Sequence, residues 1–256
     1  MQRIGIGLLG ILIGGAAAVM THPRWEAWAG NCSSCYSRPP GATIGSECPA
    51  HFENGGVVIT DPKRADALRL AMRDGIYRPW FELGRAPTPE EIGQRLQRDR
   101  AATDALINEL EACGNTAHLG VLRMPESELI AVAWPLANVP TGITVVLEGA
   151  KPVQARCAID ALGISKMMDK RATVETTMRG GVALRAVVDG DQLVSVEPPD
   201  AVVLKGPGCD DMNFFPSRTA AEAYAKGRGI QGKIFAMPEA VIHGAGSFGR
   251  MTAGLP

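Results

Sequence analysis

Apolar positions recur at helical spacing along much of the first half of the chain. Residues 61–84 begin with an aspartate that can cap a helix and a proline at the first helical position. They predict an amphipathic helix, which Pro79 is expected to kink or end. Thr88 and Glu91 have the spacing of a capping box and predict a short second helix. A third helix is predicted over residues 99–115, where a glycine near the end supplies the stop.

Two apolar runs after these helices have the composition of β-strands. Residues 118–124 and 128–136 flank a Pro-Glu-Ser turn, which predicts a hairpin. Three helices followed by a hairpin have the outline of a winged helix, so we predict a helical, winged-helix-like domain over residues 61–139. A DNA-binding role would need a basic recognition helix, and the arginines of residues 95–100 lie among acidic residues. A packing or substrate-covering role is therefore favoured.

The pattern changes near residue 140 to short β-rich runs alternating with helical segments. Strands are predicted at residues 142–149, 151–155, 171–178, 182–188, 192–196 and 201–206. Helices are predicted at residues 156–168, 217–227 and 237–246. Asp189-Gly190 has the composition of a hairpin turn. The fold class predicted for residues 140–256 is α+β, with a mixed β-sheet and short helices.

The first residues have the pattern of a targeting segment. Arg3 precedes an uncharged apolar run at residues 4–20, and Ala27-Trp28-Ala29 offers a cleavage site. Residues 1–29 are therefore predicted to be a signal peptide or a membrane anchor, which would place the rest of the chain outside the cytoplasm. A mis-assigned start site ahead of a cytoplasmic protein is the alternative. Residues 30–60, rich in Gly, Pro, Ser and Cys, are predicted to be an irregular linker that carries thiols.

Charge and cysteine content limit the classes of function. The net charge of −1 and the pI of about 6.4 provide no general attraction for nucleic acid or an acidic membrane surface, so no nucleic-acid partner is expected. Six cysteines in 256 residues are too few and too widely spaced for a disulfide scaffold. The reactivity of individual thiols is therefore the more informative question.

Cys157 and Asp160 lie three residues apart at the predicted start of a helix. At this spacing their side chains share one helix face, where the helix terminus favours a thiolate and the carboxylate opposes it. Such a pair can share one proton, attack as a nucleophile and then return the proton to a leaving atom. The alternative is a core cysteine beside an exposed aspartate.

Cys209 is the second candidate thiol. It follows a predicted strand in a turn rich in Gly and Pro and precedes two aspartates. Two thiols from separate elements, with no histidine cluster nearby, do not match the four ligands of a structural zinc site. They match a soft metal that accepts two sulfurs.

The stretch from about residue 134 to 241 resembles the catalytic domain of the alkylmercury (organomercurial) lyase family. The similar segments are "WPLANVPTGITV", "RCAIDALGISKMM", "VEPPDAVVLKGPGCDDMNFF" and "SRTAAEAYAKGRGIQGKIFAMPEA". Cys157, Asp160 and Cys209 match the family's two cysteines and aspartate, and Phe214-Phe215 match an aromatic pair. The family also has a winged-helix-like N-terminal part, which residues 61–135 resemble more loosely.

This resemblance implies that residues 140–256 form a lyase-like catalytic domain that cleaves the carbon–mercury bond of R–Hg–X. Cys157 and Cys209 would bind mercury, and Asp160 would relay the proton that releases R–H. No organic cofactor is implied, although thiols are needed for turnover. The mercury(II) product would pass to a mercuric reductase or to small thiols.

The sequence departs from the family pattern at two places. Arg156 stands where many members have a tryptophan or a small polar residue, and it is expected to stabilise either the thiolate or Asp160. The apolar N-terminal segment departs from a family that is typically cytoplasmic. Near that segment, Cys32 and Cys35 form a C-x-x-C pair that either relays mercury(II) or forms a disulfide, with Cys48 further on.

The remaining thiol and the histidines have no predicted role in the chemistry. Cys113, at the end of a predicted helix, is expected to be structural. The four histidines are scattered along the chain and are assigned no ligand role.

Two other functions compete with the lyase. A thiol-based carrier or chaperone for mercury or copper would use both cysteines but would need no proton donor. A winged-helix regulator would need a cytosolic location and a basic helix that the sequence lacks.

Overall fold

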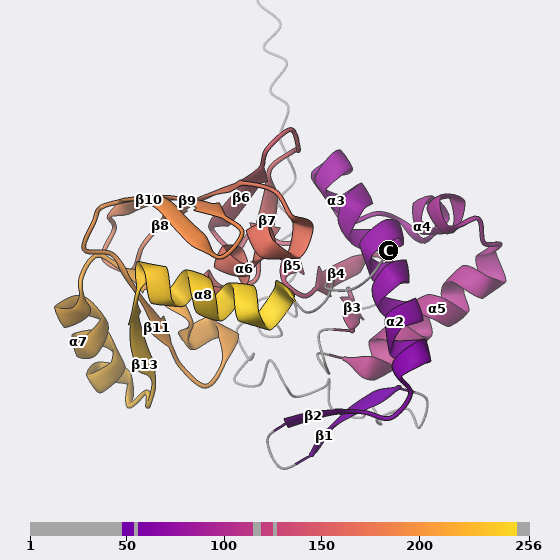
Figure 1. The fold of residues 1–256 in the computed structure, drawn as a ribbon, viewed down its shortest axis with the longest axis horizontal. Helices are drawn as coiled ribbons and strands as arrows, with labels where there is room; N and C mark the ends of the chain where they lie inside the picture. Colours follow the sequence, from indigo (N-terminus) through magenta and orange to yellow (C-terminus); the bar gives the residue numbers. More distant parts are fainter. Residues whose placement is uncertain (1–47, 54–55, 115–118, 125–126, 250–256) are drawn as a thin grey trace, which may run out of the picture.

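The computed structural model describes residues 48–53, 56–114, 119–124 and 127–249. Figure 1 shows the helices of residues 62–113 gathered on one side of the molecule and most of the later strands and helices on the other. The predicted α+β fold class is confirmed. The predicted signal or anchor segment, residues 1–29, lies outside the described residues, as do Cys32 and Cys35. The predicted domain boundaries and the winged-helix likeness stay predictions.

The helical side has helical structure in the three segments where the apolar pattern predicts it, and the first segment is divided into three elements. In chain order, the elements of this side are α2 (Pro62–Met72), η1 (Arg73–Tyr77), α3 (Arg78–Leu83), α4 (Pro89–Leu96) and α5 (Arg100–Cys113). The Asp61 carboxylate accepts a hydrogen bond from a backbone amide of the first turn of α2. Both halves of the capping box between Thr88 and Glu91 are present at the start of α4.

The predicted interruption at Pro79 has an unexpected form. The chain does not stop there; it widens into the π-helical η1 just before the proline and then continues as α3 to Leu83. Pro79 stands in the first turn of α3, where its missing N–H is tolerated. Gly84 ends the helix in the left-handed conformation, with φ of 75°.

The main sheet has eight strands in the order β10-β9-β8-β6-β7-β5-β4-β3. Their bounds are β3 (Val121–Arg123), β4 (Ile130–Ala133), β5 (Leu136–Ala137), β6 (Ile143–Leu147), β7 (Val153–Ala155), β8 (Ala172–Thr177), β9 (Ala183–Asp189) and β10 (Gln192–Glu197). The prediction of a mixed sheet was wrong, because every pairing recorded among these strands is antiparallel. Short hairpin connections such as the confirmed turn after Asp189 allow this arrangement.

A second, three-stranded sheet has the order β12-β11-β13. Its strands are β11 (Val202–Lys205), β12 (Asn213–Phe215) and β13 (Lys233–Ala236), and the 3₁₀ turn η3 (Cys209–Asp211) joins the first two. The sequence pattern predicts β11 but not β12 or β13. Both are short, at three and four residues, and take their stability from pairing with β11.

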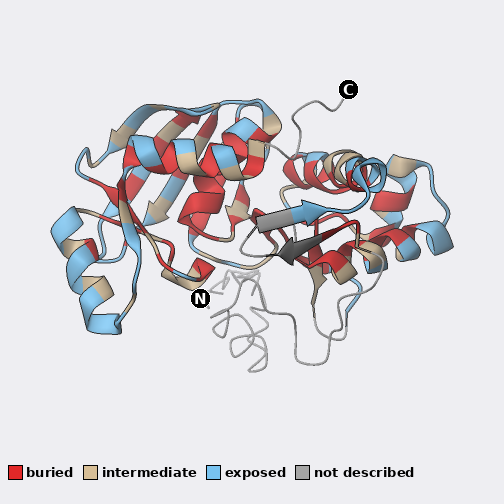
Figure 2. Ribbon diagram, turned by 60° about the horizontal axis from the view of Figure 1, so that its bottom comes forward, coloured by how far each residue is buried: buried red, intermediate tan, exposed pale blue. Residues whose placement is uncertain are grey.

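Three helices complete this side of the molecule: α6 (Ala158–Met168), α7 (Arg218–Arg228) and α8 (Met237–Phe248). All but two residues of α6 are buried, which is why its apolar pattern has no single face. In Figure 1, α8 crosses over α6, and Figure 2 shows buried segments on both helices and on the sheet beside them. Gly163 of α6 and Gly244 of α8 meet with backbone in contact.

The region predicted as an irregular linker, residues 30–60, contains a hairpin near its end. Strands β1 (Ala50–Glu53) and β2 (Gly56–Ile59) pair antiparallel, so the prediction was wrong for these residues. Cys48, just before the hairpin, forms a disulfide with Cys113 at the end of α5.

No helix in the described part of the chain combines the length and apolar character needed to cross a membrane.

Candidate functional site

Two thiols and one carboxylate meet inside the molecule. The sulfurs of Cys157 and Cys209 and a carboxylate oxygen of Asp160 all lie within 4.8 Å of one another. The three residues are 2%, 8% and 6% exposed, respectively. Among the described residues, no other group of three or more His, Cys, Asp and Glu side chains has the spacing for a metal ion.

The first two of these residues are placed by the start of α6. Cys157 is the N-cap residue, with extended φ and ψ of −151° and 178°, and Asp160 lies in the first turn. The exposed-aspartate alternative was wrong, because Asp160 is buried against the thiols. The partial positive charge at a helix N-terminus favours both a carboxylate and a thiolate there.

Cys209 comes from the other side of the cluster, on the turn η3. Its backbone carbonyl accepts a hydrogen bond of 3.0 Å from the amide of Met212, which closes the turn. The Met212 carbonyl in turn accepts a 3.1 Å hydrogen bond from the amide of Ala158, the first residue of α6. Backbone bonds therefore hold the turn that carries one thiol against the helix start that carries the other.

Met212 also brings a third sulfur to the cluster. The Cys157 thiol donates a hydrogen bond to the Met212 thioether, with 3.8 Å between the two sulfurs. Met212 is 9% exposed. Its position three residues after Cys209, on the same turn, is the sequence signal that points to it.

Arg156, just before Cys157, forms an ion pair with Asp210 of the turn η3. The guanidinium Nη2 lies 3.2 Å from the Asp210 Oδ1. Burial raises the pKa of Asp210, and the charge and hydrogen bond of Arg156 oppose that rise. Arg156 is therefore ion-paired with the residue that follows Cys209. The sequence analysis expected Arg156 to stabilise the thiolate or Asp160.

The helical side contributes Tyr77, the last residue of η1, which the sequence gave no reason to select. Its ring is fully buried, and its hydroxyl donates a 2.6 Å hydrogen bond to the carbonyl of Trp134. Burial and the negative charge of Asp160 raise the pKa of Tyr77 well above its usual value. The Asp160 carboxylate is therefore close enough to act on the Tyr77 hydroxyl through space.

The aromatic pair and one of the histidines noted in the sequence are packed within the fold. Phe214 and Phe215 lie on β12, and both are 2% exposed. His243 is stacked on Phe235, where burial lowers its pKa. His22 and His118 lie outside the described residues.

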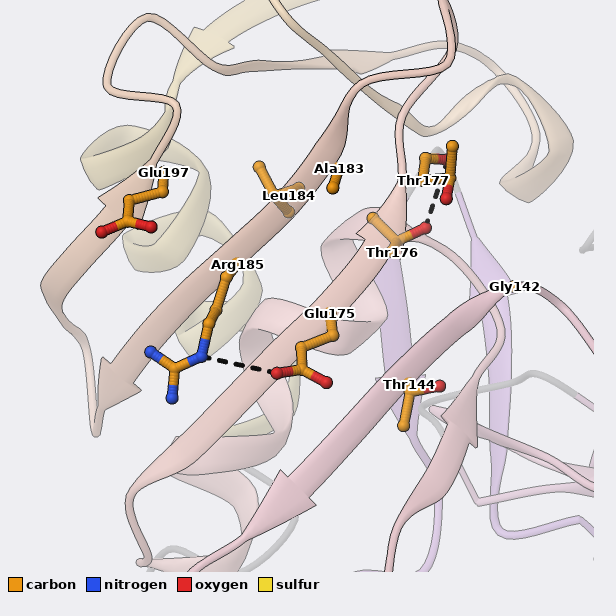
Figure 3. Close-up of a pocket in the computed structure, with 9 residues that line it drawn as sticks. All are labelled: Gly142, Thr144, Glu175, Thr176, Thr177, Ala183, Leu184, Arg185 and Glu197. Atoms are coloured by element: carbon orange, nitrogen blue, oxygen red, sulfur yellow. Dashed lines mark hydrogen bonds and ion pairs between the residues drawn. The ribbon is translucent and has the colours of Figure 1, made fainter.

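A separate hollow lies on the open face of the main sheet. Figure 3 shows Thr144, Glu175, Arg185 and Glu197 side by side on neighbouring strands, with the Glu175–Arg185 ion pair between them. The lining contains none of the three clustered residues. Side chains alternate along each strand, so this polar face is opposite the apolar face that packs on α6 and α8.

The structure is an α+β fold with two buried thiols and a carboxylate around one point, and two sulfurs are the donors that a soft metal prefers. Comparison with known proteins narrows the class of protein. Residues 136–249 match the family model described as "MerB: Alkylmercury lyase". Over these residues the chain is similar to the alkylmercury lyase family, in agreement with the resemblance of the sequence motifs.

Two individual proteins illustrate the similarity. The alkylmercury lyase of Staphylococcus epidermidis (strain ATCC 12228 / FDA PCI 1200) is 30% identical over 102 residues, which are 36% of this chain and 47% of that protein. The match therefore spans about half the length of that relative. A crystal structure described as the mercury-bound form of MerB2 superposes with a TM-score of 0.56 and 18% identity, over 75% of this chain and 98% of that one. At that identity the superposition shows a shared fold.

Proposed function

We propose that this protein is an organomercurial lyase that cleaves the carbon–mercury bond of R–Hg–X by protonolysis. The observation that carries the proposal is the buried cluster of Cys157, Asp160 and Cys209, whose ligand atoms lie within 4.8 Å of one another. The match of residues 136–249 to the alkylmercury lyase family model supports the same chemistry. The protein would act on small organomercurials, with mercury as part of the substrate and no organic cofactor.

The first stage transfers mercury to sulfur. One cysteine thiol displaces X from R–Hg–X as its sulfur binds mercury, and the proton that this thiol loses leaves with X as HX. The second cysteine then adds to the same mercury atom, because soft ions bind two sulfurs more strongly than harder donors. Sulfur donation to mercury weakens the remaining bond to carbon.

The second stage transfers a proton to carbon. Asp160 accepts the proton of the second thiol and passes it to the departing carbon, which keeps the bonding pair of the Hg–C bond and leaves as R–H. The two thiol protons are then accounted for, one in HX and one in R–H, and mercury(II) remains bound to two thiolates. Holding both thiols and the acid in place can lower such a barrier by about 7 to 11 kcal/mol.

The competing function is a carrier for mercury or copper. A carrier needs two thiols but no acid, and burying a carboxylate beside them has an energetic cost that a carrier would gain nothing from. The 6% exposure of Asp160 in the cluster therefore favours the lyase. The mercury(II) product would leave to small thiols or to a mercuric reductase.

The deciding experiment incubates reduced protein with phenylmercury acetate and excess thiol and measures benzene by gas chromatography. We expect benzene from the wild type, none from Cys157→Ala, and at least a roughly 100-fold lower rate from Asp160→Asn. Asp200→Asn removes an exposed carboxylate elsewhere and should match the wild type. Stoichiometric mercury binding without benzene would support the carrier and overturn the lyase.

We also propose that the protein works outside the cytoplasm, either exported or anchored by residues 1–29. The Cys48–Cys113 disulfide supports this location, because such bonds persist mainly in oxidising compartments. The basic start and apolar run of residues 1–20 support it independently. Fractionation of cells that express the chain with and without residues 1–29 tests it, and an unchanged cytoplasmic pool would favour a mis-assigned start site.

A further inference from the structure

The Met212 thioether accepts a hydrogen bond from the Cys157 thiol, and the proposed reaction gives this contact no role. The sulfurs of Met212 and Cys157 are 3.8 Å apart, with the thiol proton between them. In tetrahedral zinc sites, two sulfur ligands bound at about 2.3 Å to one ion also lie about 3.8 Å apart. The thioether is thus at the separation at which both sulfurs can contact one ion once that proton is replaced.

The backbone fixes Met212 in this place. Its amide and its carbonyl both make hydrogen bonds, to Cys209 and from Ala158, at 3.0 and 3.1 Å. Its side chain is buried at 9% exposure, so few alternative rotamers are open to it. The same short turn therefore presents Cys209 and Met212 to one point near the start of α6.

We propose that Met212 is a third sulfur ligand, which contacts mercury during the reaction and makes the site selective for soft ions. Thioether sulfur binds soft ions such as mercury(II) and copper(I) well and adds little for hard ones. The inference rests on the proposed function in taking mercury as the ion. It goes further in assigning a ligand outside the Cys–Asp–Cys set.

The alternative for a buried methionine is simple core filling, since its flexible side chain fits irregular gaps. Met212→Leu separates the two roles, because leucine keeps the volume and apolar character and removes the sulfur. Met237→Leu, at the buried start of α8, is the matched control for loss of a buried methionine.

The test loads the full-length protein and both variants with mercury(II) and measures its retention against a competing dithiol. We expect Met212→Leu to retain mercury about 10-fold more weakly, or worse, and Met237→Leu to match the wild type. Retention of zinc should be the same in all three proteins. Equal mercury retention in Met212→Leu, or an equal loss for zinc and mercury, would overturn the assignment.

Spectroscopy on selenomethionine protein supplies the direct readout. X-ray absorption at the mercury edge should contain a mercury–selenium contribution in the wild type that is absent from Met212→Leu and kept in Met237→Leu. Its absence from the wild type, in protein that still releases benzene, would overturn the ligand role and leave the lyase intact. Its presence in protein that releases no benzene would support the ligand and overturn the lyase.

Discussion

Two hydrogen bonds connect Tyr77, on the helical side, with the backbone just before Cys157. The Tyr77 hydroxyl donates to the Trp134 carbonyl at 2.6 Å, and the next carbonyl, of Pro135, accepts a 2.9 Å bond from the amide of Arg156. Arg156 immediately precedes Cys157. One buried side chain of the helical region therefore helps to set the backbone from which Cys157 projects.

Replacing Tyr77 with phenylalanine should weaken both the fold and the site. The change keeps the ring and leaves the buried Trp134 carbonyl without its donor, which costs about 1 to 3 kcal/mol. We expect a lower free energy of unfolding in urea and a benzene release rate reduced by more than the loss of folded protein explains. Tyr224→Phe, at a half-buried ring of α7, is the control and should change neither. Unchanged kinetics in Tyr77→Phe would limit the hydroxyl to a structural role.

Sequence reasoning at the residue scale succeeded where chemistry leaves a local signal. Cys157 and Asp160 are three residues apart on one helix start, so their proximity follows from helix geometry. Cys209 was singled out as a second candidate thiol in a turn, and the family resemblance then matched it to the same site as Cys157. Met212 and Tyr77 were missed, because buried methionines and tyrosines are usual in cores. Only tertiary packing brings Met212 to Cys157 and Tyr77 within the influence of the Asp160 charge.

At the scale of elements, the crossing of α6 and α8 sets the position of the site. A Cβ atom added at Gly163 would lie 2.6 Å from the Gly244 carbonyl oxygen, and one added at Gly244 would lie 2.7 Å from the Ile159 oxygen. Both distances are too short for real contacts. Only glycine at these two positions allows the helices to approach so closely, and α6 carries Asp160 near its start.

Gly163→Ala should therefore force the two helices apart. We expect a destabilisation of about 1 to 3 kcal/mol in urea unfolding and a loss of benzene release as α6 shifts. Gly246→Ala provides the control on the same crossing helix, because Gly246 is exposed and its added Cβ would meet open space. That variant should be as stable as the wild type or slightly more stable. Equal stability of the two variants would contradict the close-contact argument.

The start of α4 gives a pH-dependent prediction. Hydrogen bonds from Arg85, and one from the Thr88 amide, lower the pKa of Glu91 from 4.5 to about 2. A lowered carboxyl pKa means that the ionised form stabilises the fold above about pH 4.5, and that this contribution disappears as the pH falls towards 2. Glu91→Gln should thus lower stability by about 0.5 to 1 kcal/mol at pH 7 and match the wild type near pH 2.

Unfolding of both proteins across this pH range, followed by circular dichroism, tests the prediction. Glu222→Gln removes an exposed charge from α7 and should show no such convergence. A constant difference between Glu91→Gln and the wild type at every pH would show that the charge of Glu91 is not the source of the stabilisation.

The helices and strands that were predicted correctly are those with a signal in their own local sequence. The caps of α2 and α4 and the turn after Asp189 are local, and the structure has them. The hairpin β1-β2, the strands β12 and β13 and the antiparallel order of the main sheet depend on distant partners. The π-helical η1 has no sequence rule, because it arises where a proline must be accommodated within a packed helix.

At the scale of the whole molecule, one covalent bond joins the start of the described chain to the helical side. Cys48 and Cys113 are 65 residues apart in sequence, and their disulfide ties the β1-β2 hairpin to the end of α5. The sequence placed Cys113 as structural but gave no pairing, since six cysteines allow many. Cys157 and Cys209 meanwhile remain buried thiols. The protein therefore combines one disulfide with a pair of buried thiols.

This combination predicts that the two pairs respond differently to reductant. Closing a loop of 65 residues stabilises a fold by about 2 to 4 kcal/mol, so Cys48→Ser with Cys113→Ser should lower the free energy of unfolding by that amount. Wild type treated with dithiothreitol should unfold like the double variant, whereas the double variant should be insensitive to the reductant. At temperatures well below unfolding, benzene release should persist in the double variant, because the thiols proposed to bind mercury belong to other elements. Loss of all release in folded double variant would instead make the disulfide part of the active site's support.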